Sequence, residues 1–339
     1  MHAIQLIAGG ALGAVDFFHF TTIEQLQEQW ARRESDHVIL HTDNPDARIA
    51  GLLAANAKQI ILVSEDPVSA ALHIRDSSDV ELGSAVRAVS SIFASLHDVI
   101  LRCPNLLTLS PGNSATPASL VSHVLSFLGL ELTESKTTEV LRMLAGPDGN
   151  RWLYGIDRDD DARTALSKND QALLQSLIPY RSILGMKPVE RFNWPRELFF
   201  GTDRIGTPIN APFEEVIELV GPARILCCGP YFHLPPADWV LTSSIEVNDN
   251  HSGNELLIEV LAGSETLVHR PALLPDKGHY FFEVSFTITE PRNRIEFRLW
   301  TRQGAIEGTL ALKKIEVARK PDRKKQPRSG PVSSKAVSL

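Results

Sequence analysis

The apolar positions of the chain follow two different patterns. In the first half, short apolar runs such as 60–63 alternate with stretches like 67–75, where apolar residues recur at helical spacing. The runs are typical of buried strands in a parallel sheet, and the stretches of amphipathic helices. From Arg224 on, short alternating segments separated by turn residues replace this pattern. The sequence therefore predicts an α/β region followed by an all-β region.

The α/β region is expected to contain short strands joined by helices. We expect strands at 4–7, 38–40, 60–63 and 106–109, and helices at 23–30, 67–75, 80–101 and 170–184. Pro67 suits the first turn of a helix, because the N–H that proline lacks would stay unpaired there in any case. The junction before Pro67 lies at the carboxyl end of a strand, where open α/β folds place their ligands.

The all-β region is expected to be an antiparallel β-sandwich. Strands are predicted at 241–247, 256–261, 280–289, 295–300 and 309–317, with turn residues between them. Several strands at spacings of roughly ten residues, without helical stretches between them, indicate this fold. The chain thus divides into an α/β domain at 1–185, a linker at 186–222, the sandwich at 223–318 and a disordered basic tail at 319–339.

Composition and charge exclude several classes of protein. The chain has 339 residues, of which 43% are hydrophobic and 22% charged, as in ordinary globular proteins. A net charge of −7 gives no electrostatic footprint for nucleic acid. Cys103, Cys227 and Cys228 form no disulfide framework, so we expect a cytoplasmic protein. No apolar run reaches the length of a membrane span.

The strand, loop and helix at 60–75 resemble a segment of the sulfotransferase family. There a hydrophobic strand runs into Arg-x-Pro, a serine follows about eight residues later, and both residues hold the 3′-phosphate of the donor, 3′-phosphoadenosine 5′-phosphosulfate. In this chain Glu65 and His73 stand at those two positions. Four positions match the family's Pro-x9-Phe-Leu-Gly-Leu segment, namely Pro117, Phe127, Leu128 and Gly129. The resemblance covers about 1–145 and implies a parallel-sheet, three-layer α/β domain.

The glycine-rich segment after the first expected strand is similar in place to the family's phosphate loop. Gly9, Gly10 and Gly13 would form a turn between a strand and a helix, the local context of a phosphate cradle. The segment has no lysine, arginine, serine or threonine, and only Gly13 has a clear counterpart in the family's Pro-Arg-Ser-Gly-Thr-Thr loop. We therefore expect a structural turn at a degenerate donor site, and no bound cofactor.

The segment 41–45 is similar to the Thr-His-x-Pro of cytosolic sulfotransferases, whose histidine is the catalytic base. Thr42 and Pro45 match, but Asp43 replaces the histidine. Asp43 or the neighbouring His41 could accept a proton, since a carboxylate can do so when its pKa is tuned upward. The alternative is that Asp43 and Asn44 simply form a turn, which these residues favour.

Aromatic residues of the all-β region are candidates for sugar binding. Tyr231, Trp239 and Trp300, with Phe232 beside them, could form a platform for sugar rings, although aromatics in a small sandwich more often belong to its core. The segments 229–239 and 304–312 resemble accessory sandwich modules appended to bacterial glycan-processing enzymes. A carbohydrate or a glycan-assembly protein is therefore the expected partner.

Two functions are consistent with these patterns. The first is a sulfotransferase-like protein of bacterial surface-polysaccharide biosynthesis that has lost donor binding and acts as a scaffold or binding partner. The second is an active sulfotransferase or other transferase on a carbohydrate acceptor, with a rewired site. No metal is expected, because the acidic run at 157–161 is followed by Ala162 and Lys168 where a calcium loop needs glycine and glutamate. A weak anionic partner, such as a membrane surface, suits the basic tail.

Overall fold

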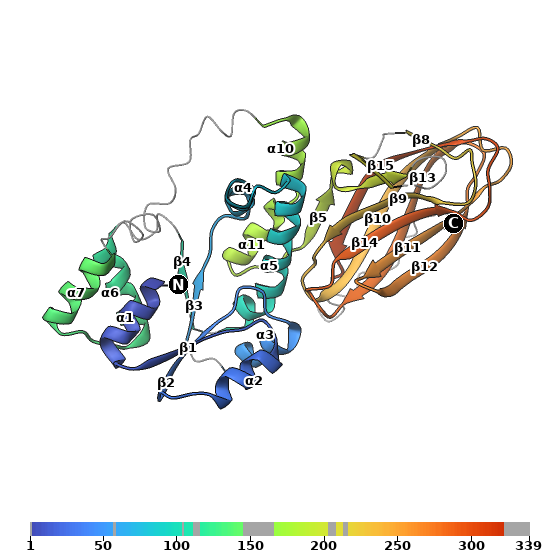
Figure 1. Ribbon diagram of the computed structural model, residues 1–339. Coiled ribbons are helices and arrows are strands. Elements are labelled where there is room, and N and C mark those ends of the chain that lie inside the picture. Colours follow the sequence, from blue (N-terminus) through green and yellow to red (C-terminus); the bar gives the residue numbers. More distant parts are fainter. Residues whose placement is uncertain are drawn as a thin grey trace, which may run out of the picture.

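The computed structural model describes residues 2–56, 59–103, 105–110, 116–144, 166–202, 208–212 and 216–321. The acidic run at 157–161 lies outside these described residues, as does the basic tail from residue 322 on. The helices gather in the first half of the chain and most strands in the second (Figure 1). The long helix α5, Leu82–Arg102, lies between these two parts.

The first part alternates short strands with helices, as the sequence predicts. Its elements are α1 (His2–Leu12), β1 (Val15–His19), α2 (Ile23–Ala31), β2 (His37–His41), α3 (Ala47–Asn56), β3 (Ile60–Val63), α4 (Pro67–Ser78), α5, β4 (Leu106–Leu109), α6 (Pro117–Leu128), α7 (Glu134–Leu144), α10 (Lys168–Gln175), the 3-10 turn η1 (Ile178–Tyr180) and α11 (Arg181–Leu184). Strands β3 and β4 have the predicted bounds. Helix α4 begins at Pro67, where Asp66 accepts hydrogen bonds from the N–H groups of Val68 and Ser69.

Parallel pairing occurs in this part, but within the described ranges it joins strands only in twos. β1 pairs with β2 from Val15–His37 to His19–His41, and β3 pairs with β4. Parallel strands packed with helices are therefore present, whereas a three-layer domain around one sheet is not shown.

The expected first strand at 4–7 is wrong, because these residues lie in helix α1. Ile4, Ile7 and Ala8 are buried at helical spacing, and Ile4 and Ile7 share a core cluster with residues of α6 and α7. Gly9 and Gly10 continue the same helix, so they form no turn after a strand. The first strand is instead β1, whose aromatic sequence VDFFH suits an extended backbone.

The second part is a β-sandwich of two antiparallel sheets. One sheet has the order β13-β10-β15-β5, with β8 also paired to β15, and the other has the order β12-β11-β14-β9-β6-β7. The strands are β5 (Arg191–Trp194), β6 (Phe200–Thr202), β7 (Pro208–Pro212), β8 (Val216–Glu218), β9 (Ile225–Phe232), β10 (Ala237–Asn248), β11 (Glu255–Ala262), β12 (Glu265–Leu273), β13 (Gly278–Ile288), β14 (Ile295–Thr301) and β15 (Thr309–Arg319), with the 3-10 turn η2 (Arg196–Leu198) after β5. The sandwich expected from the sequence is confirmed.

The expected linker at 186–222 needs correction in its described part. β5 and β8 pair with β15, and β6 pairs with β9, so this segment adds edge strands to both sheets. These strands have only three or four residues, and prolines lie between them, which gives the segment the composition of a connection. Pairing with strands far along the chain makes them part of the sandwich.

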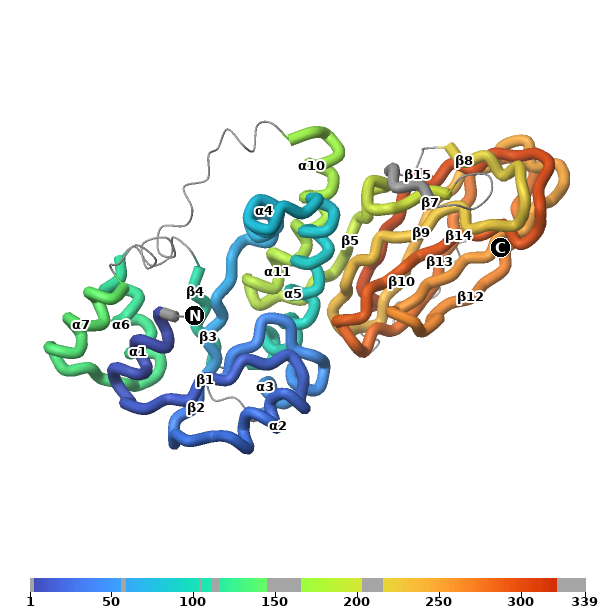
Figure 2. Tube along the Cα trace, in the orientation of Figure 1, coloured from blue at the N-terminus to red at the C-terminus, as the bar shows by residue number. Residues whose placement is uncertain are grey.

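Helix α5 packs against both parts of the molecule (Figure 2). Its Phe93 contacts Tyr180 of η1, and Tyr180 contacts Phe192 of β5, with ring centroids 5.9 and 5.0 Å apart. Phe192 in turn lies 5.7 Å from Trp239 of β10. α5 alone among the described helices is long and apolar enough to cross a membrane, and 56% of that apolar stretch is buried inside the protein. One continuous core therefore joins the helical part to the sandwich.

Trp239 should be among the most stabilising side chains, because it is fully buried and its indole N–H donates to the carbonyl of Pro235. We expect Trp239→Ala to lower the free energy of unfolding by about 3–5 kcal/mol, as for other buried aromatic residues. Phe281→Ala is the control, since 72% of Phe281 is exposed. Urea denaturation followed by circular dichroism measures both. Equal effects of the two substitutions would contradict the assigned core.

Candidate functional site

The outer face of the six-stranded sheet carries aromatic and charged side chains next to one another. Along β14, Ile295, Phe297 and Leu299 point into the core and are fully buried. Because successive side chains of a strand point to opposite faces, Glu296, Arg298 and Trp300 point outward. The outward residues of the neighbouring strands then follow from the register.

Two rows of this face cross β14. Trp300 is paired with Leu257 of β11 and Ile225 of β9. Arg298 is paired with Glu259 of β11 and Cys228 of β9, and Cys228 is paired in turn with Phe200 of β6. Trp300 and Phe200 are both partly exposed. An apolar row with an indole ring therefore lies beside a row that contains two charged groups, a thiol and a phenyl ring.

Tyr231 stands at the end of this face that is nearest to α5. Its backbone has φ 60°, a left-handed conformation that non-glycine residues adopt uncommonly and that clusters at functional sites. Its hydroxyl donates to Oε1 of Glu296 at 3.1 Å, and its ring centroid lies 5.9 Å from that of Phe200. The guanidinium carbons of Arg87 and Arg294 lie 5.9 and 5.4 Å from its ring centroid.

The acidic side chains of the face each have a cationic or imidazole partner. Glu296 binds Arg298 through two contacts of 2.7 and 2.8 Å. Glu259 contacts Nδ1 of His269 at 2.9 Å. Glu255, at the edge of the face, pairs with Arg302 at 3.0 Å. These contacts hold the polar groups in fixed orientations.

Burial keeps the Tyr231 hydroxyl and the Cys228 thiol of this face protonated. It raises the pKa of Tyr231, and the neighbouring Cys228 and Glu296 raise that pKa further. Burial also raises the pKa of Cys228, against a weaker opposing effect of its contact with Tyr231. Tyr231 therefore remains a hydrogen-bond donor and Cys228 a thiol at neutral pH.

The structure brings two of the three predicted aromatic residues onto this face. Tyr231 and Trp300 lie on it, whereas Trp239 is fully buried in the core and offers no ring to a ligand. Phe200 and Arg87 were missed, because one was assigned to the linker and the other to a helix of the preceding domain. No local pattern in the sequence could have placed either beside Tyr231.

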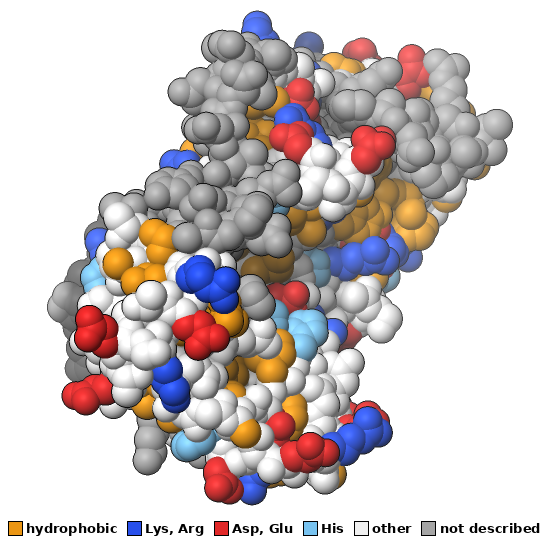
Figure 3. All heavy atoms as spheres, turned by 60° about the vertical axis from the view of Figure 1, so that its left-hand side comes forward, with side chains coloured by type: hydrophobic (Ala, Val, Ile, Leu, Met, Phe, Trp, Pro, Cys, Tyr) orange, Lys and Arg blue, Asp and Glu red, His pale blue; other side chains and the backbone are white. Residues whose placement is uncertain are grey.

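The two predicted base candidates lie at a second place, the carboxyl ends of β1 and β2. There the rings of His19 and His41 are 4.8 Å apart, and Nε2 of His19 lies 3.7 Å from Oδ1 of Asp43. The side chains of His19 and Asp43 are 52% and 61% exposed. In Figure 3, histidine side chains lie next to acidic ones near the middle of the view. His19, which the sequence analysis did not single out, thus completes a cluster with His41 and Asp43.

The surroundings of His41 lower its pKa. Burial lowers the pKa of His41, and the nearby positive charge of His19 lowers it further, while Asp43 acts in the opposite direction. A histidine with a lowered pKa is neutral at pH 7 and can accept a proton. The cluster can therefore provide a general base.

The expected donor positions do not form a site. Gly10 packs within α1 against Leu132 and Val140, and its carbonyl accepts a hydrogen bond from Nζ of Lys136. Gly13 follows α1 with φ 83°, so it remains a turn glycine, although after a helix. Glu65 lies in the loop between β3 and α4, and His73 is an exposed residue of α4.

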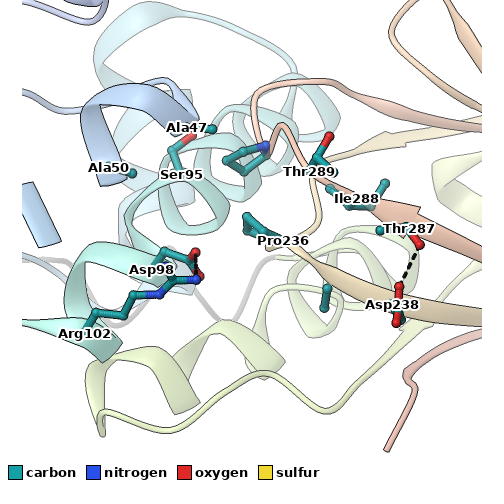
Figure 4. A pocket seen from close by; sticks show the side chains of 12 residues that line it. Ala47, Ala50, Ser95, Asp98, Arg102, Pro236, Asp238, Thr287, Ile288 and Thr289 are labelled. Carbon is teal, nitrogen blue, oxygen red and sulfur yellow. Dashed lines mark hydrogen bonds and ion pairs between the residues drawn. The ribbon is translucent and has the colours of Figure 1, made fainter. Parts of the chain in front are cut away.

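A cavity of about 450 Å³ lies between the two parts of the molecule (Figure 4). It is bordered by residues of α3 and α5 on one side and of β10 and β13 on the other. Its charged groups are already engaged, since Asp98 pairs with Arg102 at 2.7 Å and Asp238 accepts from the hydroxyl of Thr287 at 2.6 Å. Within the described ranges, no group of three or more His, Cys, Asp or Glu residues could hold a metal ion.

The proton affinity of His41 gives a test of the histidine cluster. We expect the pKa of His41 to lie below 6.5 in the folded protein, to fall further in Asp43→Asn and to rise in His19→Ala. The first change removes a negative charge and the second a positive one. NMR titration of the histidine ring protons measures these shifts. A pKa that neither substitution moves would show that the three groups do not interact.

Comparisons with known proteins show only distant likeness. No family model matches the chain, and no curated protein sequence matches it. Among solved structures, a family 16 carbohydrate-binding module is 14% identical, with 30% of this chain and 72% of that chain covered and a TM-score of 0.23. The xylan-binding module CBM15 is 12% identical, with 38% and 95% covered and a TM-score of 0.29. An adhesin domain of Lys-gingipain from Porphyromonas gingivalis is 11% identical, with 33% and 70% covered and a TM-score of 0.23. Because each of these three TM-scores is below 0.3, these likenesses support no conclusion about the ligand of this chain.

Proposed function

We propose that this protein binds carbohydrate through the outer face of its six-stranded sheet. The observation that carries the proposal is the placement of Trp300, Phe200 and Tyr231 on one sheet face together with the Arg298–Glu296 pair. Sugars present apolar C–H faces and hydroxyl edges. A ligand of this kind needs aromatic rings beside polar groups in fixed positions, and this face offers both.

The rigidity of the polar groups favours binding. Arg298 and Glu296 are locked together by two contacts, so a ligand would not have to order these long side chains. The five residues from Glu296 to Trp300 span about 13 Å along the strand, which suits a short oligosaccharide better than a single sugar. The unusual backbone of Tyr231 also supports a functional role, since such conformations persist where the surroundings hold them in place.

The biological setting belongs to the same proposal. We assign the protein to bacterial surface-polysaccharide assembly in the cytoplasm, as a scaffold or binding partner that has lost donor binding. Gly9 and Gly10 lie within a helix, which supports the loss of donor binding, because no glycine-rich loop with free N–H groups follows a strand there. The resemblance of 229–239 and 304–312 to glycan-enzyme modules supports the setting.

Removing an aromatic ring from this face should weaken carbohydrate binding. We expect Trp300→Ala and Tyr231→Ala to weaken binding about tenfold, because the loss of a stacking ring costs about 0.5–1.5 kcal/mol beyond its buried area. Affinity electrophoresis through gels containing soluble polysaccharides, namely xylan, hydroxyethylcellulose, polygalacturonate and sulfated galactan, measures the effect.

Phe281→Ala is the matched control for this experiment. Phe281 is the most exposed aromatic residue described and lies on β13, in the opposite sheet. Removing the Phe281 ring should leave the retardation of the protein by the polysaccharide gels unchanged. Loss of binding in Phe281→Ala, with Trp300→Ala unaffected, would move the ligand to the other sheet and overturn the assigned face.

A second function, transfer onto a carbohydrate acceptor, is supported by one observation. His41 is held neutral beside His19 and Asp43, so it could serve as a base in an active sulfotransferase or other transferase. Thermal shift with 3′-phosphoadenosine 5′-phosphate tests this function. The proposal of a non-catalytic binding protein predicts no shift. A ligand at a hundred times its Kd would stabilise by about 2.7 kcal/mol, and such a result would favour the transferase.

A further inference from the structure

We infer that the carbohydrate recognised by this face is acidic, and that Arg87 and Arg294 hold its anionic substituent. The inference rests on the proposed function, because it names the class of ligand for the same face. The two guanidinium groups lie beside Tyr231, at the end of the face that meets α5. They come from distant elements, one from α5 and the other from the residue before β14.

Arg87 is fixed in place by the backbone of the sandwich. Its Nε donates to the carbonyl of Pro230 at 2.8 Å and its Nη2 to that of Leu198 at 3.3 Å. The guanidinium also lies 5.1 Å from the ring centroid of Phe200. Gly229 permits this arrangement, since a Cβ there would stand 2.8 Å from the carbonyl oxygen of Leu198. The cation is therefore positioned before any ligand arrives.

The positive charge of Arg87 is not balanced by a carboxylate. Among the described residues, neither Arg87 nor Arg294 forms an ion pair with an acidic side chain. In contrast, Arg298 pairs with Glu296 and Arg302 pairs with Glu255. Burial lowers the pKa of Arg87, while Tyr231 and Glu81 act in the opposite direction. Arginine nevertheless stays protonated in proteins. Two unbalanced cations thus remain at one end of a face whose acidic groups are already paired.

An anionic group on a sugar ring would supply the missing charge. Guanidinium groups bind carboxylate and sulfate oxygens through charge-assisted hydrogen bonds, which are stronger than those to neutral hydroxyls. The guanidinium carbons of both cations lie within 6 Å of the Tyr231 ring centroid, so both positive charges attract an anionic substituent bound at this end. Neutral sugars would leave the two charges unbalanced, and this difference is the basis of selectivity.

Polysaccharides that differ only in charge test the inference on the full chain. Polygalacturonate is compared with its methyl ester, and a sulfated galactan with its desulfated form, by affinity electrophoresis at low and high salt. We expect at least one acidic member to bind tenfold or more tightly than its neutral counterpart, with the preference reduced by salt. The pair that shows the preference identifies the anion as a carboxylate or a sulfate.

Arginine variants assign the preference to these residues. Arg294→Gln, at an exposed position, should lower affinity for the acidic polymer at least fivefold and leave the neutral one unchanged. Arg87→Lys should also weaken binding of the acidic polymer, because lysine keeps the positive charge but lacks the planar guanidinium group. Arg191→Gln is the control at an arginine outside this face, since Arg191 lies on β5 of the opposite sheet, pairs with Glu316 at 3.2 Å and should show no change.

The outcomes separate this inference from the proposed function. Equal binding of acidic and neutral polymers, both lost in Trp300→Ala, overturns the acidic preference and leaves carbohydrate binding intact. An acidic preference that survives Arg294→Gln and Arg87→Lys overturns the assigned residues. Failure of every polymer to retard the protein overturns the proposed function and this inference together.

Discussion

The packing of helix α5 determines how the rest of this molecule is arranged. Its apolar face contributes Val86, Val89 and Phe93 to a core that continues through Tyr180 and Phe192 to the interior of the sandwich. A helix buried on several sides must be apolar over much of its surface, which also gives α5 the composition of a membrane span. The polar residues that remain make specific bonds, such as the hydroxyl of Ser90, which accepts from the N–H of His233.

Sequence periodicity predicted the elements whose patterns are local. The bounds of β3 and β4 follow from short apolar runs, and the start of α4 follows from Pro67. The stretch 4–7 was misread, because a short apolar run can be a strand or part of a buried helix, and periodicity alone does not separate them. The short strands β5, β6 and β8 were missed because each is stabilised by pairing with residues that lie far along the chain.

The candidate site was predictable only in part for the same reason. The sequence marks Tyr231 and Trp300 as candidate sugar-binding residues because they are aromatic. It marks Trp239 for the same reason, although Trp239 is a core residue. The sequence does not show which side of a strand faces the core when alternation is interrupted by bulges, as between β14 and β9. Likewise, His19 joins His41 only because β1 and β2 pair in parallel with these residues in register.

The bonds from Arg87 to the sandwich bear on how this β-domain can be transplanted. Many binding modules can be moved between proteins because their recognition surface lies within one contiguous segment. Here a segment cut at residue 223 would lose β5, β6 and β8, and it would also lose the guanidinium that α5 places against Pro230. The smallest portable unit therefore includes α5, and a fusion protein that carries only the strands would keep Trp300 without the cation that accompanies Tyr231.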